Sequence, residues 1–321
     1  MKRVIIDTDP GIDDAAAILL ALASPELSVE AITTVYGNGP VEASTRNARR
    51  ILHAAGRTDI PVHQGAGKPL LRHPNPGWAS QVHGTDALGD AEILDPPIES
   101  GPVKERHAVL EVIERVIAAP GEITLLSLGR LTNLALALAL EPRVAQSVSE
   151  IIVMGGAITV PGNISPVASA NLYEDPEAAA MVYSSGAPLV QVGLDVCDLV
   201  EISQGQLDQI SKAGTPITRL LTAATPCLQA YYRRRGMLAD PNAVRYNDLP
   251  AIAYTVDPEL FDTQDLYVAI ETHSPLTRGQ TVADRRNNSG HPSNVKVCTG
   301  LDAARLAALF TERITAYQAN D

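Results

Sequence analysis

The chain has 321 residues, which is enough for one large α/β domain or two smaller ones with a substantial core. A formal net charge of −12 excludes the basic footprint of a nucleic-acid-binding protein, so we expect no nucleic-acid partner. We expect a cytoplasmic protein with no membrane partner, because its three cysteines are widely spaced and it shows neither an apolar signal region nor a long charge-free apolar stretch.

The N-terminal segment places four carboxylates between a predicted strand and a predicted helix. Residues 2–6 predict a short buried strand, and the Ala- and Leu-rich residues 15–22 predict a helix. The carboxylates between them are Asp7, Asp9, Asp13 and Asp14. Ligands of open α/β sheets bind at this end of a strand, and a hard divalent cation would offset the mutual repulsion of the carboxylates. A turn in which Asp13 only caps the helix explains one aspartate and leaves the others unexplained.

Strand-like and helical runs then alternate along the chain. Further strands are predicted at residues 29–35, 60–63, 123–128, 151–156 and 188–193. Helices are predicted at about residues 41–55, 104–118 and 251–254, and two more begin after residue 133 and at residue 176. Residues 65–102 predict a long loop, which is expected to be functional. This alternation predicts an α/β fold: an open, mostly parallel (mixed) sheet with helices on both faces. No linker divides the chain, so we predict a single domain over residues 1–321.

Polar residues follow several of the predicted strands. Asn38 follows the second strand, Asn163 and Asn171 follow the strand at 151–156, and Asp248 opens the helix near 251. Each of them alone is typical of a turn or a helix cap. Their joint placement at one edge of the sheet favours a functional site.

The opening motif, residues 7–15 (DTDPGIDDA), resembles the signature of the nucleoside hydrolases, the inosine–uridine preferring N-ribohydrolases. The likeness extends across nearly the whole chain, through residues 35–38 (VYGN), 128–135 (LGRLTNLA), 154–156 (MGG), 175–179 (DPEAA) and 276–279 (LTRG). It implies a Rossmann-like nucleoside hydrolase fold, a small-molecule nucleoside substrate and a homodimer or homotetramer.

The resemblance also implies a calcium ion at the bottom of a pocket. Its ligands would be Asp9, Asp14, Asp248 and the backbone carbonyl of Leu128. Oxygen-only ligation from separate segments suits Ca²⁺. The implied reaction is hydrolysis of a ribosyl C–N bond through an oxocarbenium-like transition state.

The remaining implied roles concern water and the sugar. Asp9, helped by the ion, would deprotonate the attacking water, and Asn38 would position that water. Asp13 and Asn171 would hold the ribose hydroxyls, and Asn163 would bind the 5′ end.

Two positions depart from the family pattern. Ser169 stands where the family commonly has a Glu that binds the 5′-hydroxyl. Asn247 stands where it commonly has a His that protonates the leaving base, and an amide cannot serve as a general acid near neutral pH. Both residues remain candidates for substrate contact, and the substrate specificity is expected to be altered.

Other residues could contact the base. His83 resembles a base-contacting His of pyrimidine-preferring members, and it could equally be a surface-loop His. Tyr231 and Tyr232 precede a run of three arginines on a predicted helix, where one of them should reach the pocket. The sequence does not decide which of the two tyrosines does so, and we take Tyr232 as the candidate.

The leading hypothesis is therefore a calcium-dependent ribonucleoside hydrolase that releases ribose and a free base. The alternative is a catalytically weak ribose- or nucleoside-binding protein that keeps the metal site. A haloacid-dehalogenase-like phosphatase would match the spacing of Asp7 and Asp9, but it leaves Asp13, Asn38 and Asp248 unexplained.

Overall fold

The apolar N-terminal run forms β1 (Lys2–Thr8), which lies in the middle of the sheet with Val4, Ile5 and Ile6 fully buried. Strands buried on both faces read as continuous apolar runs, as this one does. The computed structural model describes residues 1–73, 78–91 and 103–318. Parts of the loop predicted at 65–102 therefore lie outside the described residues.

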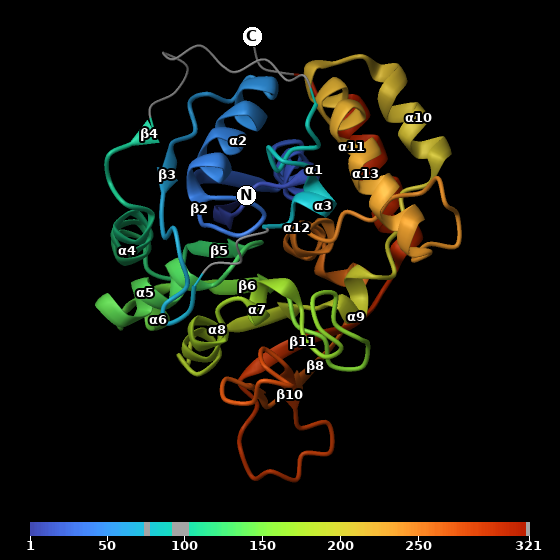
Figure 1. The fold of residues 1–321 in the computed structure, drawn as a ribbon. Coiled ribbons are helices and arrows are strands. Elements are labelled where there is room, and N and C mark those ends of the chain that lie inside the picture. Colours follow the sequence, from blue (N-terminus) through green and yellow to red (C-terminus); the bar gives the residue numbers. More distant parts are fainter. Residues whose placement is uncertain (74–77, 92–102, 319–321) are drawn as a thin grey trace.

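Nine strands of the described chain form one open sheet in the order β4-β3-β2-β1-β5-β6-β7-β11-β8. The first eight in this order run parallel, and β8 pairs antiparallel with β11 at the edge. The predicted mixed, mostly parallel sheet is thus confirmed. The strands after β1 are β2 (Leu27–Thr34), β3 (Val62–Gln64), β4 (Val103–Lys104), β5 (Ile123–Ser127), β6 (Glu150–Met154), β7 (Leu189–Val192), β8 (Phe261–Leu266) and β11 (Val295–Leu301). A separate antiparallel ribbon of β9 (Val268–Ile270) and β10 (Thr281–Ala283) projects away from the sheet (Figure 1).

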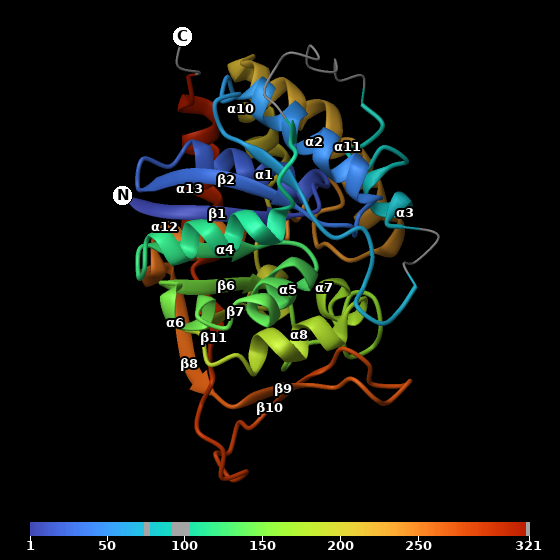
Figure 2. The same ribbon diagram turned by 90° about the vertical axis from the view of Figure 1, so that its left-hand side faces the viewer.

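Helices cover both faces of the sheet (Figures 1 and 2). One apolar core lies beneath α1 (Ile12–Leu22), α2 (Val41–Ala54), α10 (Gln204–Ala213), α11 (Pro216–Arg235), α12 (Leu249–Val256) and α13 (Ala303–Ala316). A second core lies beneath α4 (Ala108–Ala118), α5 (Thr132–Leu140), α6 (Val144–Ser147) and α8 (Pro176–Tyr183). The short helices are α3 (Ser80–His83), α7 (Ala170–Tyr173), α9 (Leu194–Cys197) and the 3₁₀ turn η1 (Pro258–Leu260). In the described chain, no helix is long and apolar enough to cross a membrane.

The strand order reverses beside β1. The chain proceeds from β1 outward through β2, β3 and β4, and then returns to the other side of β1 with β5. At such a switch point the two connecting loops diverge, which opens a crevice at the carboxyl ends of the strands. The segments that border this crevice are the turn after β1, which carries Asp9, and the turn after β5, which carries Leu128.

The start of α1 differs from the sequence prediction by three residues. The helix begins at Ile12, so that Asp13 and Asp14 both lie in its first turn. Asp14 supplies the cap, because its Oδ2 accepts a hydrogen bond from the Gly11 N–H at 2.9 Å. Asp13 Oδ1 also accepts a hydrogen bond, from the Asp14 N–H at 3.2 Å, so both aspartates satisfy donors at the start of the helix. Two carboxylates at a helix N-terminus gain favourable interaction with the helix dipole.

Candidate active site

A cavity of about 330 Å³ opens at the carboxyl ends of the parallel strands. Its walls come from the turns after β1, β2, β5 and β6 and from α3, α11 and the start of α12. Every residue predicted for the site lines it: Asp9, Asp13, Asp14, Asn38, His83, Leu128, Asn163, Ser169, Asn171, Tyr232, Asn247 and Asp248. Asp7, the other carboxylate of the opening motif, is not among the lining residues. It accepts hydrogen bonds from Thr33 and Asn133 inside the sheet.

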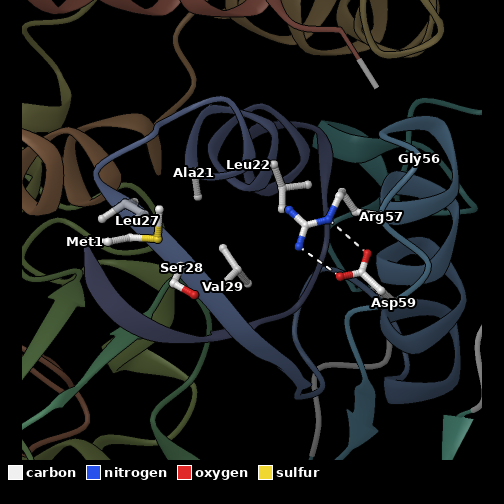
Figure 3. Close-up of a pocket in the computed structure, with 9 residues that line it drawn as sticks. All are labelled: Met1, Ala21, Leu22, Leu27, Ser28, Val29, Gly56, Arg57 and Asp59. Atoms are coloured by element: carbon white, nitrogen blue, oxygen red, sulfur yellow. Dashed lines mark hydrogen bonds and ion pairs between the residues drawn. The ribbon is translucent and has the colours of Figure 1, made fainter. Parts of the chain in front are cut away.

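A second hollow of about 430 Å³ lies at the opposite end of the sheet, near the starts of β1 and β2 (Figure 3). Its charged lining groups are Arg57 and Asp59, which pair with each other at 2.9 Å. Since this pair satisfies itself and lies near the surface, the hollow offers no group for catalysis.

Three carboxylates converge at the bottom of the first cavity. Asp13 and Asp14 come from the first turn of α1, and Asp248 is the residue before α12. One oxygen from each lies within 4.8 Å of the others, which is a spacing that could hold a metal ion. Asp14 and Asp248 are almost completely buried.

Burial controls the electrostatics of this cluster. Desolvation raises the pKa of Asp13 to about 6, and it raises the pKa values of Asp14 and Asp248 as well. The neighbouring carboxylates raise the pKa values of Asp14 and Asp248 further. Without a compensating cation, ionising all three carboxylates would reduce the stability of the folded protein. The donor set therefore fits a hard divalent cation, which favours several oxygen ligands.

Asp9 lies beside the cluster but has different partners. Its Oδ2 accepts hydrogen bonds from the Asn38 N–H at 2.7 Å and from Arg130 Nη1 at 2.5 Å. The Asn38 side chain bridges to the cluster, because its Nδ2 donates to Asp14 Oδ2 at 3.0 Å. The structure thus places Asp13 in the three-carboxylate group, whereas the resemblance implied Asp9.

The residues expected to hold the sugar line one wall of the cavity. Asn171 Nδ2 donates to the carbonyls of Leu128 at 2.6 Å and Met154 at 3.0 Å. Ser169 is buried, and its Oγ accepts a hydrogen bond from the Gly156 N–H at 2.7 Å. Asn163 is exposed at the rim, where its Oδ1 accepts a hydrogen bond from the Ala170 N–H.

His83 is buried at the end of α3, so the surface-loop interpretation is wrong, and its Nδ1 lies 3.8 Å from Asp13 Oδ1. Its Nδ1 accepts a hydrogen bond from the Ile12 N–H at 3.2 Å, which assigns the proton of the neutral ring to Nε2. Burial lowers its pKa to about 4, so the ring is neutral at pH 7.

Asn247, the residue that stands where the resemblance implied a histidine, also lines the cavity. Asn247 Oδ1 is buried and has no hydrogen-bond partner among the described residues. Tyr231 and Tyr232 both line the cavity, with their rings 5.5 Å apart in an edge-on arrangement. The sequence could not choose between these tyrosines, and the structure brings both of them to the cavity. Burial raises the pKa of Tyr232, so its phenol stays protonated.

Sequence reasoning missed Arg130 and Glu174, which also line the cavity. Arg130 lies within the LGRLTN motif, and Glu174 lies just before Asp175, which accepts the Ala178 N–H as the N-cap of α8. Each lies in a segment that looked like an ordinary turn or helix start. The available signal for Arg130 was a charged residue shortly after the end of β5, which is rare in a buried turn. Glu174 follows the short helix α7 and gave no such signal.

Solved structures share this architecture over the full chain. A purine-preferring ribonucleoside hydrolase from Gardnerella vaginalis superimposes with a TM-score of 0.92 at 30% identity, covering 98% of this chain and 99% of the other. A plant nucleoside hydrolase also gives a TM-score of 0.92, at 37% identity, and again covers 98% and 99%. The fold and these relatives define an N-glycosyl hydrolase.

Sequence comparison shows the family to which the chain belongs. A pyrimidine-specific ribonucleoside hydrolase of Shewanella sp. (strain ANA-3) is 37% identical over 318 residues, covering 98% of this chain and 97% of the relative. A sequence model described as inosine-uridine preferring nucleoside hydrolase matches residues 4–308. The chain belongs to this family.

Stability of the cation-free protein should fall with rising pH because of Asp13. Its pKa is about 6 in the folded protein and 3.8 in the unfolded chain, so the folded state binds more protons in between. We expect this group's contribution to the free energy of unfolding to decrease by about 2–3 kcal/mol between roughly pH 4 and 6.5. The measurement is urea denaturation of wild type and Asp13→Asn in a chelator. Parallel pH curves for the two proteins would contradict the expectation. Added Ca²⁺ should remove most of the difference between the pH dependence of wild type and that of Asp13→Asn.

Proposed function

We propose that this protein hydrolyses the N-glycosidic bond of ribonucleosides with the help of a bound Ca²⁺, releasing ribose and a free base. The observation that carries the proposal is the convergence of Asp13, Asp14 and Asp248 beside the buried carboxylate of Asp9. Asp9, Asp14, Asp248 and the carbonyl of Leu128 are the proposed ligands, and Asp13 lies within reach of the same ion. When bound, the ion would supply positive charge that binds the sugar hydroxyls and acidifies a water.

Asp9 is the proposed general base. Its Oδ2 is taken by two donors, while Oδ1 has no hydrogen-bond partner among the described residues and can accept a proton from water. Asn38 donates through its backbone N–H to Asp9 and through its side chain to Asp14, so it couples the base to the carboxylate cluster. This arrangement supports a role for Asn38 in positioning the attacking water.

The sugar would lie between the carboxylate cluster and Asn171. Asp13 is the less buried of the two aspartates of α1, and it is proposed to accept hydrogen bonds from ribose hydroxyls together with Asn171 Oδ1. Positive charge that develops at C1′ would be stabilised by the surrounding carboxylates, which are already oriented before the reaction. A deoxyribose would leave buried polar groups unpaired and should react poorly.

The base would lie toward His83, Tyr231, Tyr232 and Asn247. His83 is neutral and presents Nε2–H as a donor, which suits a carbonyl or ring nitrogen of a base. The relatives of this chain include one named as pyrimidine-specific and one named as purine-preferring. Pyrimidine and purine nucleosides therefore both belong in a substrate test. A homodimer or homotetramer and a cytoplasmic location are further proposals, which rest on the family resemblance and on three free cysteines.

The alternative function is a catalytically weak ribose- or nucleoside-binding protein. It is favoured by Asn247, which leaves no histidine at the proposed acid position. Hydrolysis of p-nitrophenyl riboside separates the two functions, because its good leaving group needs no acid. An enzyme should cleave it, whereas a binding protein should not. Cleavage of p-nitrophenyl phosphate in its place would indicate a phosphatase.

The 5′ side of the sugar site should tolerate modification because Ser169 replaces an expected Glu. Ser169 is neutral, and its hydroxyl keeps a hydrogen to donate after it accepts from Gly156. We expect kcat/KM for the 5′-deoxy form and the 5′-monophosphate to fall by less than about 10³-fold relative to the parent nucleoside. Ser169→Glu should restore preference for a free 5′-hydroxyl.

Ser169→Ala is the matched control, because it removes the hydroxyl without adding a carboxylate. It should leave the ranking of the three substrates unchanged. Rejection of both modified substrates by more than about 10³-fold in wild type would show that another residue fills the place of the Glu. The three arginines after Tyr232 do not line the cavity, so a phosphate would gain no help from them.

A further inference from the structure

Arg130 is a buried cation at the edge of the proposed catalytic centre, and none of the roles described above uses it. Its side chain is only 3% exposed and pairs with two carboxylates, Asp9 and Glu174. Burying a guanidinium is costly unless its donors find partners. The partners of Arg130 are therefore informative about what the residue does.

Each hydrogen bond of the guanidinium reaches a residue that lines the cavity. Nη1 donates to Asp9 Oδ2 at 2.5 Å and to Asn171 Oδ1 at 3.2 Å. Nε donates to Glu174 Oε2 at 2.9 Å. Because the guanidinium is planar and rigid, the Glu174 contact sets the plane in which Nη1 meets Asp9 and Asn171.

The contacts define the orientation of the Asp9 carboxylate. Oδ2 accepts from Arg130 and from the Asn38 N–H, so it is saturated, and Oδ1 is the oxygen left for a water or an ion. Backbone packs closely on both sides. A Cβ on Gly129 would lie 2.5 Å from Oδ1, and a Cβ on Gly37 would overlap both Oδ2 and Arg130 Nη1. The carboxylate therefore has little room to turn while Arg130 is present.

The same guanidinium orients Asn171. Arg130 can only donate, so the amide oxygen of Asn171 must face it. The amide nitrogen then faces the carbonyls of Leu128 and Met154, to which it donates. One side chain thus sets the direction of both the proposed base and the proposed ribose-binding amide.

We propose that Arg130, held in place by Glu174, is a positioning residue that fixes the Asp9 carboxylate with Oδ1 directed to the reacting water. This inference rests on the proposed hydrolase function. A purely structural ion pair would make a different prediction, because its removal would affect folding stability and leave the turnover of folded enzyme unchanged.

The test compares four variants: Arg130→Ala, Arg130→Lys, Glu174→Gln and the double variant Arg130→Ala/Glu174→Ala. We measure kcat and KM for a cleaved nucleoside at saturating Ca²⁺, together with the thermal unfolding midpoint.

Arg130→Ala should lower kcat by about 10- to 100-fold, since a charge-assisted hydrogen bond is lost, and should change KM by less than about threefold. Arg130→Lys should recover part of kcat, because an ammonium can reach Asp9 but cannot hold Glu174 in the same plane. Glu174→Gln should lower kcat less than Arg130→Ala does, because it weakens the support of Arg130 and leaves the Asp9 contact in place.

The double variant is the decisive comparison. Arg130→Ala leaves the Glu174 carboxylate, which is only 11% exposed, without its ion-pair partner. The double variant removes this carboxylate, so the unfolding midpoint should recover toward that of wild type while kcat stays low. Recovery of kcat together with stability would overturn the positioning role. Arg143→Ala, which breaks an exposed pair with Glu141, is the matched control and should leave both quantities unchanged.

Calorimetric titration with Ca²⁺ supplies a readout that does not depend on turnover. Arg130→Ala should bind the ion at least as well as wild type, because a nearby positive charge has been removed. Loss of Ca²⁺ binding in this variant would overturn the inference, since the effect would then lie on the ion site. If wild type cleaves no nucleoside, the proposed function itself fails. If wild type is active and Arg130→Ala is equally active, only this inference fails.

Discussion

Asp9→Ala and Asp14→Ala should each abolish nucleoside hydrolysis, lowering kcat/KM by at least about 10³-fold. Asp9 is the proposed base. Its loss removes Oδ1, which would accept the proton of the attacking water, and also removes the partner of Arg130. Asp14 belongs to the three-carboxylate group and also accepts hydrogen bonds from Thr8 and Gly11. Its removal therefore weakens both ion binding and the start of α1.

The same prediction can be made without mutation. Exhaustive chelation should remove activity, and Ca²⁺ should restore it, because three converging carboxylates need a compensating charge. Asp14→Asn keeps the shape of the side chain, removes its charge and turns one of its two accepting oxygens into a donor. Asp59→Ala is a control, since this carboxylate is exposed and pairs only with Arg57 at the far end of the sheet. Full activity in chelated protein with no metal by elemental analysis would refute the calcium proposal.

Asn247→His should increase hydrolysis of purine nucleosides, by up to about 10²–10⁴-fold if the new imidazole protonates the leaving base. Asn247 lines the cavity, and its Oδ1 is buried without a hydrogen-bond partner among the described residues. The wild-type amide cannot give up a proton, so we expect slow turnover of inosine. The increase should be much smaller for p-nitrophenyl riboside, whose leaving group needs no acid.

Asn247→Ala and Asn247→Gln are the controls, because neither introduces an acid. Both should leave the ratio of inosine to p-nitrophenyl riboside turnover near the wild-type value. A wild-type enzyme that cleaves inosine as fast as the activated riboside would contradict this account. Tyr231 and Tyr232 would then be the first residues to test as an alternative donor, since both line the cavity.

The location of the site was predictable because its core is local in sequence. Residues 7–14 join a buried strand to a helix, and both elements could be recognised from their composition. Wherever the sheet placed this junction, the aspartates had to gather at the carboxyl end of β1. The alternation of strands and helices likewise predicted a parallel sheet, since parallel neighbours require a crossover connection. The family motifs extended the prediction to Asn171 and Asp248.

The orientation of each carboxylate was not predictable in this way. The first turn of α1 directs Asp13 and Asp14 toward Asp248, whereas Asp9 turns to Arg130 and Asn38. Which oxygens meet depends on where the helix begins and on how α12 packs against α1. Neither quantity follows from hydrophobic periodicity, which gives the buried face of an element but not its contacts with distant segments.

The sequence by itself determined the parallel α/β architecture and the acidic junction after β1, because these are set by local composition and residue identity. The resemblance to the family added the expectation of a histidine at position 247, where this chain has Asn. The tertiary structure alone decided that β5 returns beside β1, and that Arg130 lies between Asp9 and Glu174. The physical reason is that a buried charge is tolerated only where its partners meet it. Arg130, Asp9 and Glu174 lie in three separate turns, which only the completed sheet brings together.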